Sequence, residues 1–89
     1  MLVLPAELTH AQARACTQLL LQKLRQEPQS QIVVDASALT TFDSSALAVL
    51  LECRRAAVAE RKGLVVKAMP AGLASLAGLY GVQELLPVV

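Results

Sequence analysis

The residues best placed to do chemistry lie in one short run, Asp43-Ser44-Ser45, which precedes a long segment of apolar residues at helical spacing. Asp and Ser are both preferred at the N-cap of a helix, so Asp43 and Ser44 are candidates for a purely structural capping role. A serine hydroxyl exposed at a helix N-terminus is also a candidate regulatory point. Free backbone N–H groups and the positive end of the helix dipole would favour a phosphate there.

Catalysis by Ser44 lacks the partners that it would need. A nucleophilic serine requires a base and a group that orients the base. The only histidine is His10, beside an expected helix cap, and nothing in the sequence brings it to Ser44. Asp35 and Asp43 could form a carboxylate pair, but an Asp after a strand more often caps a loop. The chain has no glycine-rich phosphate-binding loop, so we expect no enzymatic activity.

Composition argues against metals, cofactors and nucleic acids. Cys16 and Cys53 fall among apolar residues and form no CxxC motif, so we interpret them as reduced packing residues and not as zinc ligands. Eight Lys and Arg against seven Asp and Glu leave a net charge of +1, with no basic cluster. Phe42 and Tyr80 are the only aromatic residues, too few to stack a single strand.

Strand and helix signals alternate along the chain, which places the Asp43-Ser44-Ser45 run within an α/β fold. Thr9-His10-Ala11-Gln12 matches a capping box, and apolar residues at spacings of three and four follow it. Short β-branched runs without alternation are typical of strands covered on both faces, and strands that alternate with helices imply a mostly parallel sheet. The expected order is a strand at Leu2–Leu4, a helix from Thr9 to Pro28, a strand at Gln31–Ala36, a loop at Ser37–Phe42, a helix at about Ser44–Arg61 with Gly63 as its C-cap, a strand at Leu64–Val66, a helix from Pro70 to Gly81 and a final short strand at Leu85–Val89.

With 89 residues, the chain is expected to form one domain over residues 1–89. The N-terminus has no basic region and too short an apolar run for a signal peptide. Residues 68–83 carry no formal charge, but they contain Pro70 and three glycines and fall short of the roughly 20 apolar residues of a membrane span. We therefore expect a cytoplasmic protein without direct membrane insertion.

The helix expected at Ser44–Arg61 has an outer face that is unusually apolar for a solvated surface. At 100° per residue, Leu47, Leu50, Ala57 and Val58 fall together and are expected to face the sheet. An alanine-rich helix of good propensity is one explanation of the other face, and close approach by a partner is the second. The residues expected on that outer face are Ser45, Ala48, Val49, Glu52, Arg55, Ala56 and Ala59.

The pattern over residues 31–89 resembles the STAS family, which includes the anti-anti-sigma factors and domains attached to transporters. The resemblance is carried by Ile32-Val33-Val34-Asp35, Leu39, Phe42-Asp43-Ser44-Ser45-Ala46-Leu47, Gly63 and Gly81. In that family, the hydroxyl residue directly after the Asp is the phosphorylated or partner-contacting position, which here is Ser44. The resemblance also implies the STAS-like fold, a mostly parallel sheet with helices packed on it.

Two departures from the anti-anti-sigma pattern favour another branch of the family. Ala46 stands where those factors usually have Gly, and the chain reaches its first helix by Thr9, without their longer initial strand or hairpin. Both features look more like the small STAS subunit of the Mla phospholipid-transport ABC system. The resemblance thus implies a non-catalytic regulatory or assembly subunit that binds the cytoplasmic ATPase and reaches the inner membrane only through it. The alternative is an anti-anti-sigma factor whose partner is an anti-sigma factor kinase.

The same resemblance predicts where the partner binds. Ser44 is expected at the centre of the interface. Around it are expected Asp43, Ser45, Ala48, Val49 and Glu52.

Overall fold

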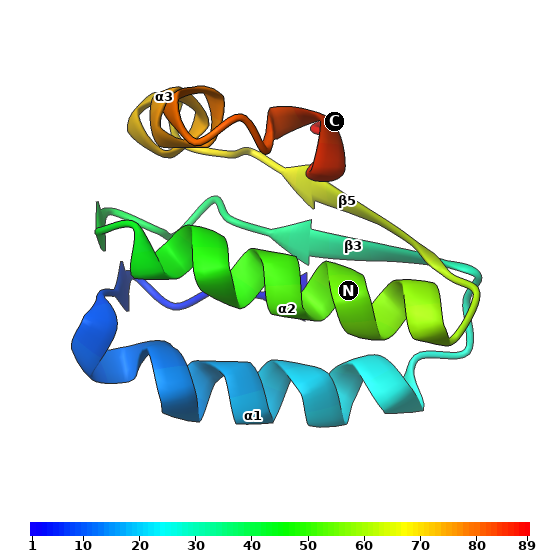
Figure 1. The fold of residues 1–89 in the computed structure, drawn as a ribbon. Coiled ribbons are helices and arrows are strands. Elements are labelled where there is room, and N and C mark those ends of the chain that lie inside the picture. Colours follow the sequence, from blue (N-terminus) through cyan, green and yellow to red (C-terminus); the bar gives the residue numbers. More distant parts are fainter.

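The computed structural model describes all 89 residues, Met1–Val89, and its main feature is a parallel sheet (Figure 1). The strand order is β1-β3-β5, and both neighbouring pairs run parallel. Strands β2 and β4 form a separate two-stranded parallel sheet. The elements are β1 (Leu2–Val3), β2 (Glu7–Leu8), α1 (His10–Gln26), β3 (Gln31–Asp35), β4 (Thr41–Phe42), α2 (Ser45–Ala59), β5 (Gly63–Lys67), α3 (Ala71–Leu79) and the 3₁₀ helix η1 (Gln83–Leu85).

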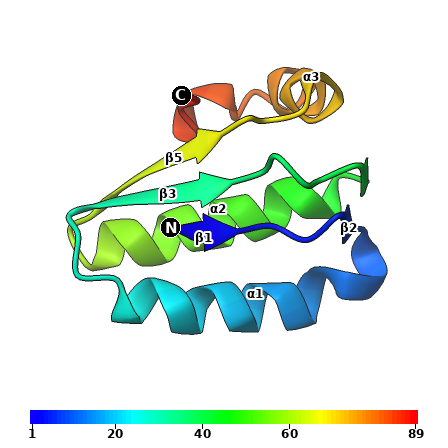
Figure 2. The same ribbon diagram turned by 180° about the vertical axis from the view of Figure 1, so that it is seen from behind.

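Helices α1 and α2 lie side by side and cover one face of the main sheet, while α3 lies beyond β5 (Figure 1). Seen from behind, the strands stand in front of α2, α1 lies below them in the view, and no helix covers the strands on this side (Figure 2). The expected α/β architecture with a parallel sheet is therefore confirmed. None of the helices is both long enough and apolar enough to cross a membrane.

The hydrophobic core fills the space between the sheet and the α1–α2 layer. Strand register places Leu2, Val34 and Val66 in one row across the sheet, and all three are buried. Leu24 of α1 and Leu50 of α2 are likewise fully buried. Burying each such side chain contributes about 1.5–3 kcal/mol. No polar or charged residue is buried with them, so the core has no site for buried acid–base chemistry.

Two expectations about short elements are wrong. The predicted loop before α2 contains β4, which pairs with β2; two-residue strands are too short to show a period in the sequence. The final strand is reduced to one parallel bridge between Val66 and Val88. The Val66 N–H donates to the Pro87 carbonyl at 2.8 Å, and the Val89 N–H donates to the Val66 carbonyl at 3.0 Å. Pro87 has no N–H of its own to add to this bridge.

The end of α2 also differs from the expectation. The helix ends at Ala59, and the residue that takes the left-handed conformation is Arg61, with φ of 59°. Gly63 is instead the first residue of β5, where its N–H donates to the Ser30 carbonyl at 2.9 Å. Glycine is favoured in the left-handed region but is not required there, so its position in the sequence was a poor guide to this helix end.

Candidate functional site

Asp43 joins the N-termini of the two packed helices. One carboxylate oxygen accepts the backbone N–H of Ser45 at 2.8 Å, and the other accepts the backbone N–H of His10 at 3.1 Å. Each helix begins with N–H groups that lack partners within the helix, and Asp43 satisfies one in each. The hydrogen bond from Ser45 and the one from His10 hold the pKa of Asp43 below its ordinary value.

Ser44 is exposed, and its hydroxyl makes no hydrogen bond within the protein. Its backbone is already helical, and its carbonyl accepts the N–H of Leu47 at 3.1 Å and that of Ala48 at 3.3 Å. Of the two candidate capping residues, Asp43 therefore supplies the side-chain cap and Ser44 does not. The serine hydroxyl is left free for a partner or for a modifying enzyme.

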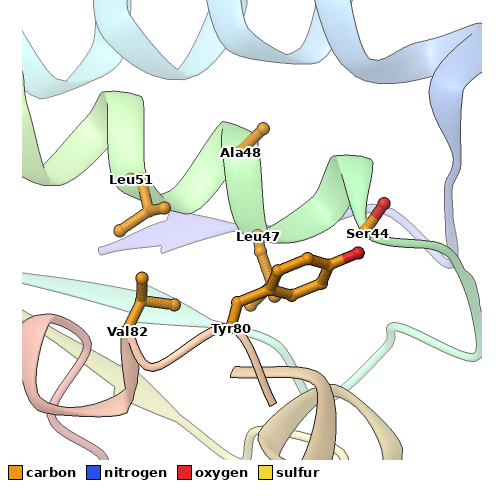
Figure 3. Close-up of a pocket in the computed structure, with 6 residues that line it drawn as sticks. All are labelled: Ser44, Leu47, Ala48, Leu51, Tyr80 and Val82. Atoms are coloured by element: carbon orange, nitrogen blue, oxygen red, sulfur yellow. The ribbon is translucent and has the colours of Figure 1, made fainter. Parts of the chain in front are cut away.

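A shallow pocket of about 380 Å³ opens beside Ser44 (Figure 3). One wall is formed by α2 and the other by the segment after α3, where Tyr80 extends its ring toward Ser44. Gly81, with φ of +70°, makes the turn that places Tyr80 and Val82 on this wall. Five of the six lining residues are hydrophobic, and the lining consists of Ser44, Leu47, Ala48, Leu51, Tyr80 and Val82.

The predicted orientation of α2 is wrong at two residues. Val49 was expected on the outer face, but its side chain is only 2% exposed. Val58 was expected to face the sheet and is 54% exposed. The reason is that α1 packs along α2, so the buried arc of α2 extends toward α1 and away from α3. Val49 therefore belongs to the core and is removed from the candidate interface.

The other predicted interface residues remain on the surface. Ala48 is exposed and lines the pocket with Ser44, while Ser45 is half-buried at the start of α2. Glu52 is exposed one turn after Ala48 and lies 3.8 Å from Arg55 in an exposed ion pair. The structure thus brings Ser44 and Ala48 into one pocket, with charged side chains farther along the helix.

Four lining residues were not among the predicted interface residues. Leu47 was expected only to face the sheet. Leu51 lies on the side of α2 that faces the segment after α3, and its position on the helical wheel, between Leu47 and Arg55, was the available signal. Tyr80 and Val82 come from a distant part of the chain. Only Gly81 marked their turn, and a turn signal does not say which helix the turn will face.

His10 lies closer to this site than the sequence suggested, because its backbone N–H bonds to Asp43. The contact is through the backbone, and the imidazole makes no hydrogen bond to Ser44 or to Asp43. A serine, histidine and aspartate triad requires the ring nitrogens to bridge the hydroxyl and the carboxylate. The three residue types are neighbours here without that geometry.

The two cysteines lie on the facing helices α1 and α2 and are both free thiols. Cys53 is buried, and desolvation, with smaller contributions from Cys16 and Glu52, raises its pKa to about 12. Partial burial also raises the pKa of Cys16. Since the thiolate is the reactive form, neither residue is a favourable nucleophile.

Known proteins were compared with this chain by fold and by sequence. A crystal structure described as an anti-sigma factor antagonist from Thermotoga maritima, an assignment given there as provisional, superposes with a TM-score of 0.80 at 13% identity; the match covers 97% of this chain and 75% of that chain. At this identity the match shows the fold alone. None of the curated proteins compared matches the sequence significantly. The family model described as "MlaB, STAS domain" matches residues 1–87. This chain therefore belongs to the STAS-domain family.

Proposed function

We propose that this protein is a non-catalytic regulatory or assembly subunit that binds the cytoplasmic ATPase of a phospholipid-transporting, Mla-type ABC transporter. The observation that carries the proposal is the exposed apolar pocket beside the free hydroxyl of Ser44. The description of the matching family model supports the transporter branch. The protein would then be cytoplasmic and would reach the inner membrane through its partner.

The pocket has the composition of the centre of a protein interface. Interface cores are apolar and poor in charge, and charged residues lie at the rim. Leu51, Val82 and the ring of Tyr80 supply the apolar lining, while Asp43 and Glu52 are exposed acidic groups outside it. We expect the partner to insert one apolar side chain here and to place a neutral hydrogen-bond donor near Ser44.

The absence of catalysis is part of the proposal. Ser44 has no hydrogen-bonded base, and the core contains no buried polar group that could assist one. No group of three His, Cys, Asp or Glu side chains could hold a metal ion. Nucleotide or ester turnover by the purified protein, lost in Ser44→Ala, would contradict this part of the proposal.

Co-purification tests the partner. The tagged chain is purified from the organism that encodes it, and the proteins retained are identified by mass spectrometry. We expect an ABC ATPase with its permease. Recovery of an anti-sigma factor kinase without any ATPase would contradict the transporter role and favour the alternative.

The alternative is an anti-anti-sigma factor that is switched by phosphorylation of Ser44. The fold match to an anti-sigma factor antagonist is the observation that favours it. A phosphate on Ser44 would add roughly two negative charges to the pocket rim and beside Asp43. Incubation with the cognate kinase and ATP should then place one phosphate on wild-type protein and none on Ser44→Ala, as intact-mass measurement would show.

A further inference from the structure

A second apolar groove shares no lining residue with the Ser44 pocket. It runs between the segment of β1 and β2 and the helix α1, and has a volume of about 380 Å³. Val3 on one wall is 57% exposed, and Leu19 on the other is 52% exposed. Helix α2 lies between α1 and α3 (Figure 1), and the residues that line this groove and those that line the Ser44 pocket are entirely different. The Glu7 end of the groove is the end nearer to Ser44, because β2 pairs with β4 and the His10 N–H donates to Asp43.

Charge is distributed along this groove in a simple order. Glu7 lies at the end where α1 begins, and the Gln12 side chain donates to its carboxylate at 3.1 Å. Lys23 lies at the other end, about 16 Å along the helix from Gln12. Lys23 forms no ion pair or hydrogen bond in the structure, and Glu27, four residues later, is paired with the N-terminal amine at 3.2 Å.

No other charge interrupts the apolar stretch between the two ends. Ala15, Cys16 and Leu19 line the middle of the groove. At 100° per residue, Arg14 falls on the opposite side of α1. Gln22 falls beside the groove and carries no charge. The groove is therefore acidic at one end, apolar in the middle and basic at the other end.

We propose that this groove is the interface of a two-fold symmetric homodimer. In a symmetric pair the same patch meets itself, so the patch must be complementary to itself. A two-fold axis that crosses α1 between Cys16 and Leu19 would place Glu7 of each chain against Lys23 of its partner. The same operation would stack the exposed apolar side chains of Val3 and Leu19 on those of the other chain. A second copy satisfies both the apolar and the charged features, and the Ser44 pocket of each copy stays open.

Sedimentation equilibrium of the full chain tests the assembly. Between about 1 μM and about 1 mM protein, we expect a monomer–dimer equilibrium that approaches twice the 9.4 kDa mass of one chain. Leu19→Glu should weaken dimerisation at least about tenfold, since it buries unpaired carboxylates near the axis. Val58→Glu is the matched control, because Val58 is 54% exposed on α2 and lies outside the groove; it should dimerise normally.

A charge exchange tests the two-fold arrangement itself. Lys23→Glu makes both end contacts acidic, and Glu7→Lys makes both basic, so each variant alone should dimerise about tenfold more weakly than wild type. An equal mixture of the two should form a heterodimer of nearly wild-type affinity, because every end contact is again an opposite pair. Rescue in the mixture cannot arise if either variant is misfolded.

The proposal would be overturned if the wild-type protein stays monomeric over the whole concentration range. That result would also be expected if a different protein, and not a second copy, occupies the groove. Normal dimerisation of Leu19→Glu, or a mixture no tighter than its two components, would overturn the proposal as well. Because the Ser44 pocket takes no part in these contacts, none of these results bears on the proposed ATPase binding.

Discussion

At the scale of single residues, Asp43 holds the helix N-termini, and Ser44 is the residue that we propose contacts the partner. Both were candidates for the helix cap. The structure gives the cap to Asp43, whose carboxylate holds the first turns of both α1 and α2, and leaves the Ser44 hydroxyl without a partner. A substitution at Ser44 should therefore report on binding, and one at Asp43 should report on folding.

Ser44→Ala and Ser44→Asp should separate binding from stability. Since the hydroxyl makes no hydrogen bond in the protein, Ser44→Ala should change the free energy of unfolding by less than about 0.5 kcal/mol. Ser44→Asp should also fold normally, because the helix dipole favours a carboxylate at this position. In the complex, only the Asp variant adds a charge beside Asp43, so it should bind the partner more weakly than Ser44→Ala. Thermal melts and calorimetric titration measure the two effects, and equal binding by both variants would remove Ser44 from the interface.

Asp43 should contribute to the acid sensitivity of the fold. Its folded pKa lies below the ordinary value of 3.8, so the folded state holds its proton less tightly than the unfolded chain does. The stabilisation is complete above about pH 4 and is lost as the pH falls through the folded pKa. The stability difference between wild type and Asp43→Asn should therefore narrow as the pH falls below 4 in urea titrations. Glu84→Gln, a change at an exposed carboxylate without a hydrogen bond, is the control; a constant difference for Asp43→Asn would contradict the assignment.

At the scale of elements, the sequence predicted the three helices and the strands of the main sheet well. Long apolar stripes and the Ile32–Val34 and Leu64–Val66 runs leave few alternatives for an α/β chain. The pairing of β2 with β4 was missed because two residues carry no period. The orientation of α2 was partly wrong because a helical wheel gives the relative angles of residues but not the width of the buried arc. That width depends on α1, a tertiary neighbour.

Val49 and Ala48 are adjacent residues that the structure assigns to opposite environments. Val49→Glu should destabilise the fold by more than about 3 kcal/mol, because the new carboxylate would be buried without a partner. Ala48→Glu places the same side chain on the surface and should change stability by less than about 0.5 kcal/mol. Urea denaturation of both variants makes the comparison. A stable Val49→Glu would mean that the predicted outer face was correct and that the packing of α1 on α2 is not as described.

At the scale of the whole molecule, α1 and α2 form one layer over the sheet, and the two candidate surfaces lie on either side of that layer. The Ser44 pocket is formed by α2 together with a turn nearly forty residues later in the chain. Gly81 is the only sequence signal for that turn. The sequence alone could therefore locate Ser44 but not the residues that face it across the pocket. The groove along α1 needs β1 beside the helix. Both surfaces depend on tertiary packing, which explains why the local sequence pattern predicted the helix N-terminus better than the surfaces around it.

The most direct test of the central claim is calorimetric titration of the chain with the ABC ATPase subunit that co-purifies with it, using a matched pair of α2 variants. Ala48→Glu places a charge in the Ser44 pocket, while Ala59→Glu places the same charge about 16 Å along the helix. We expect wild type and Ala59→Glu to bind alike and Ala48→Glu to bind at least about tenfold more weakly, with all three proteins equally stable. Unchanged binding by a folded Ala48→Glu, or no binding by wild type, would contradict the claim that this pocket is the site through which the protein acts.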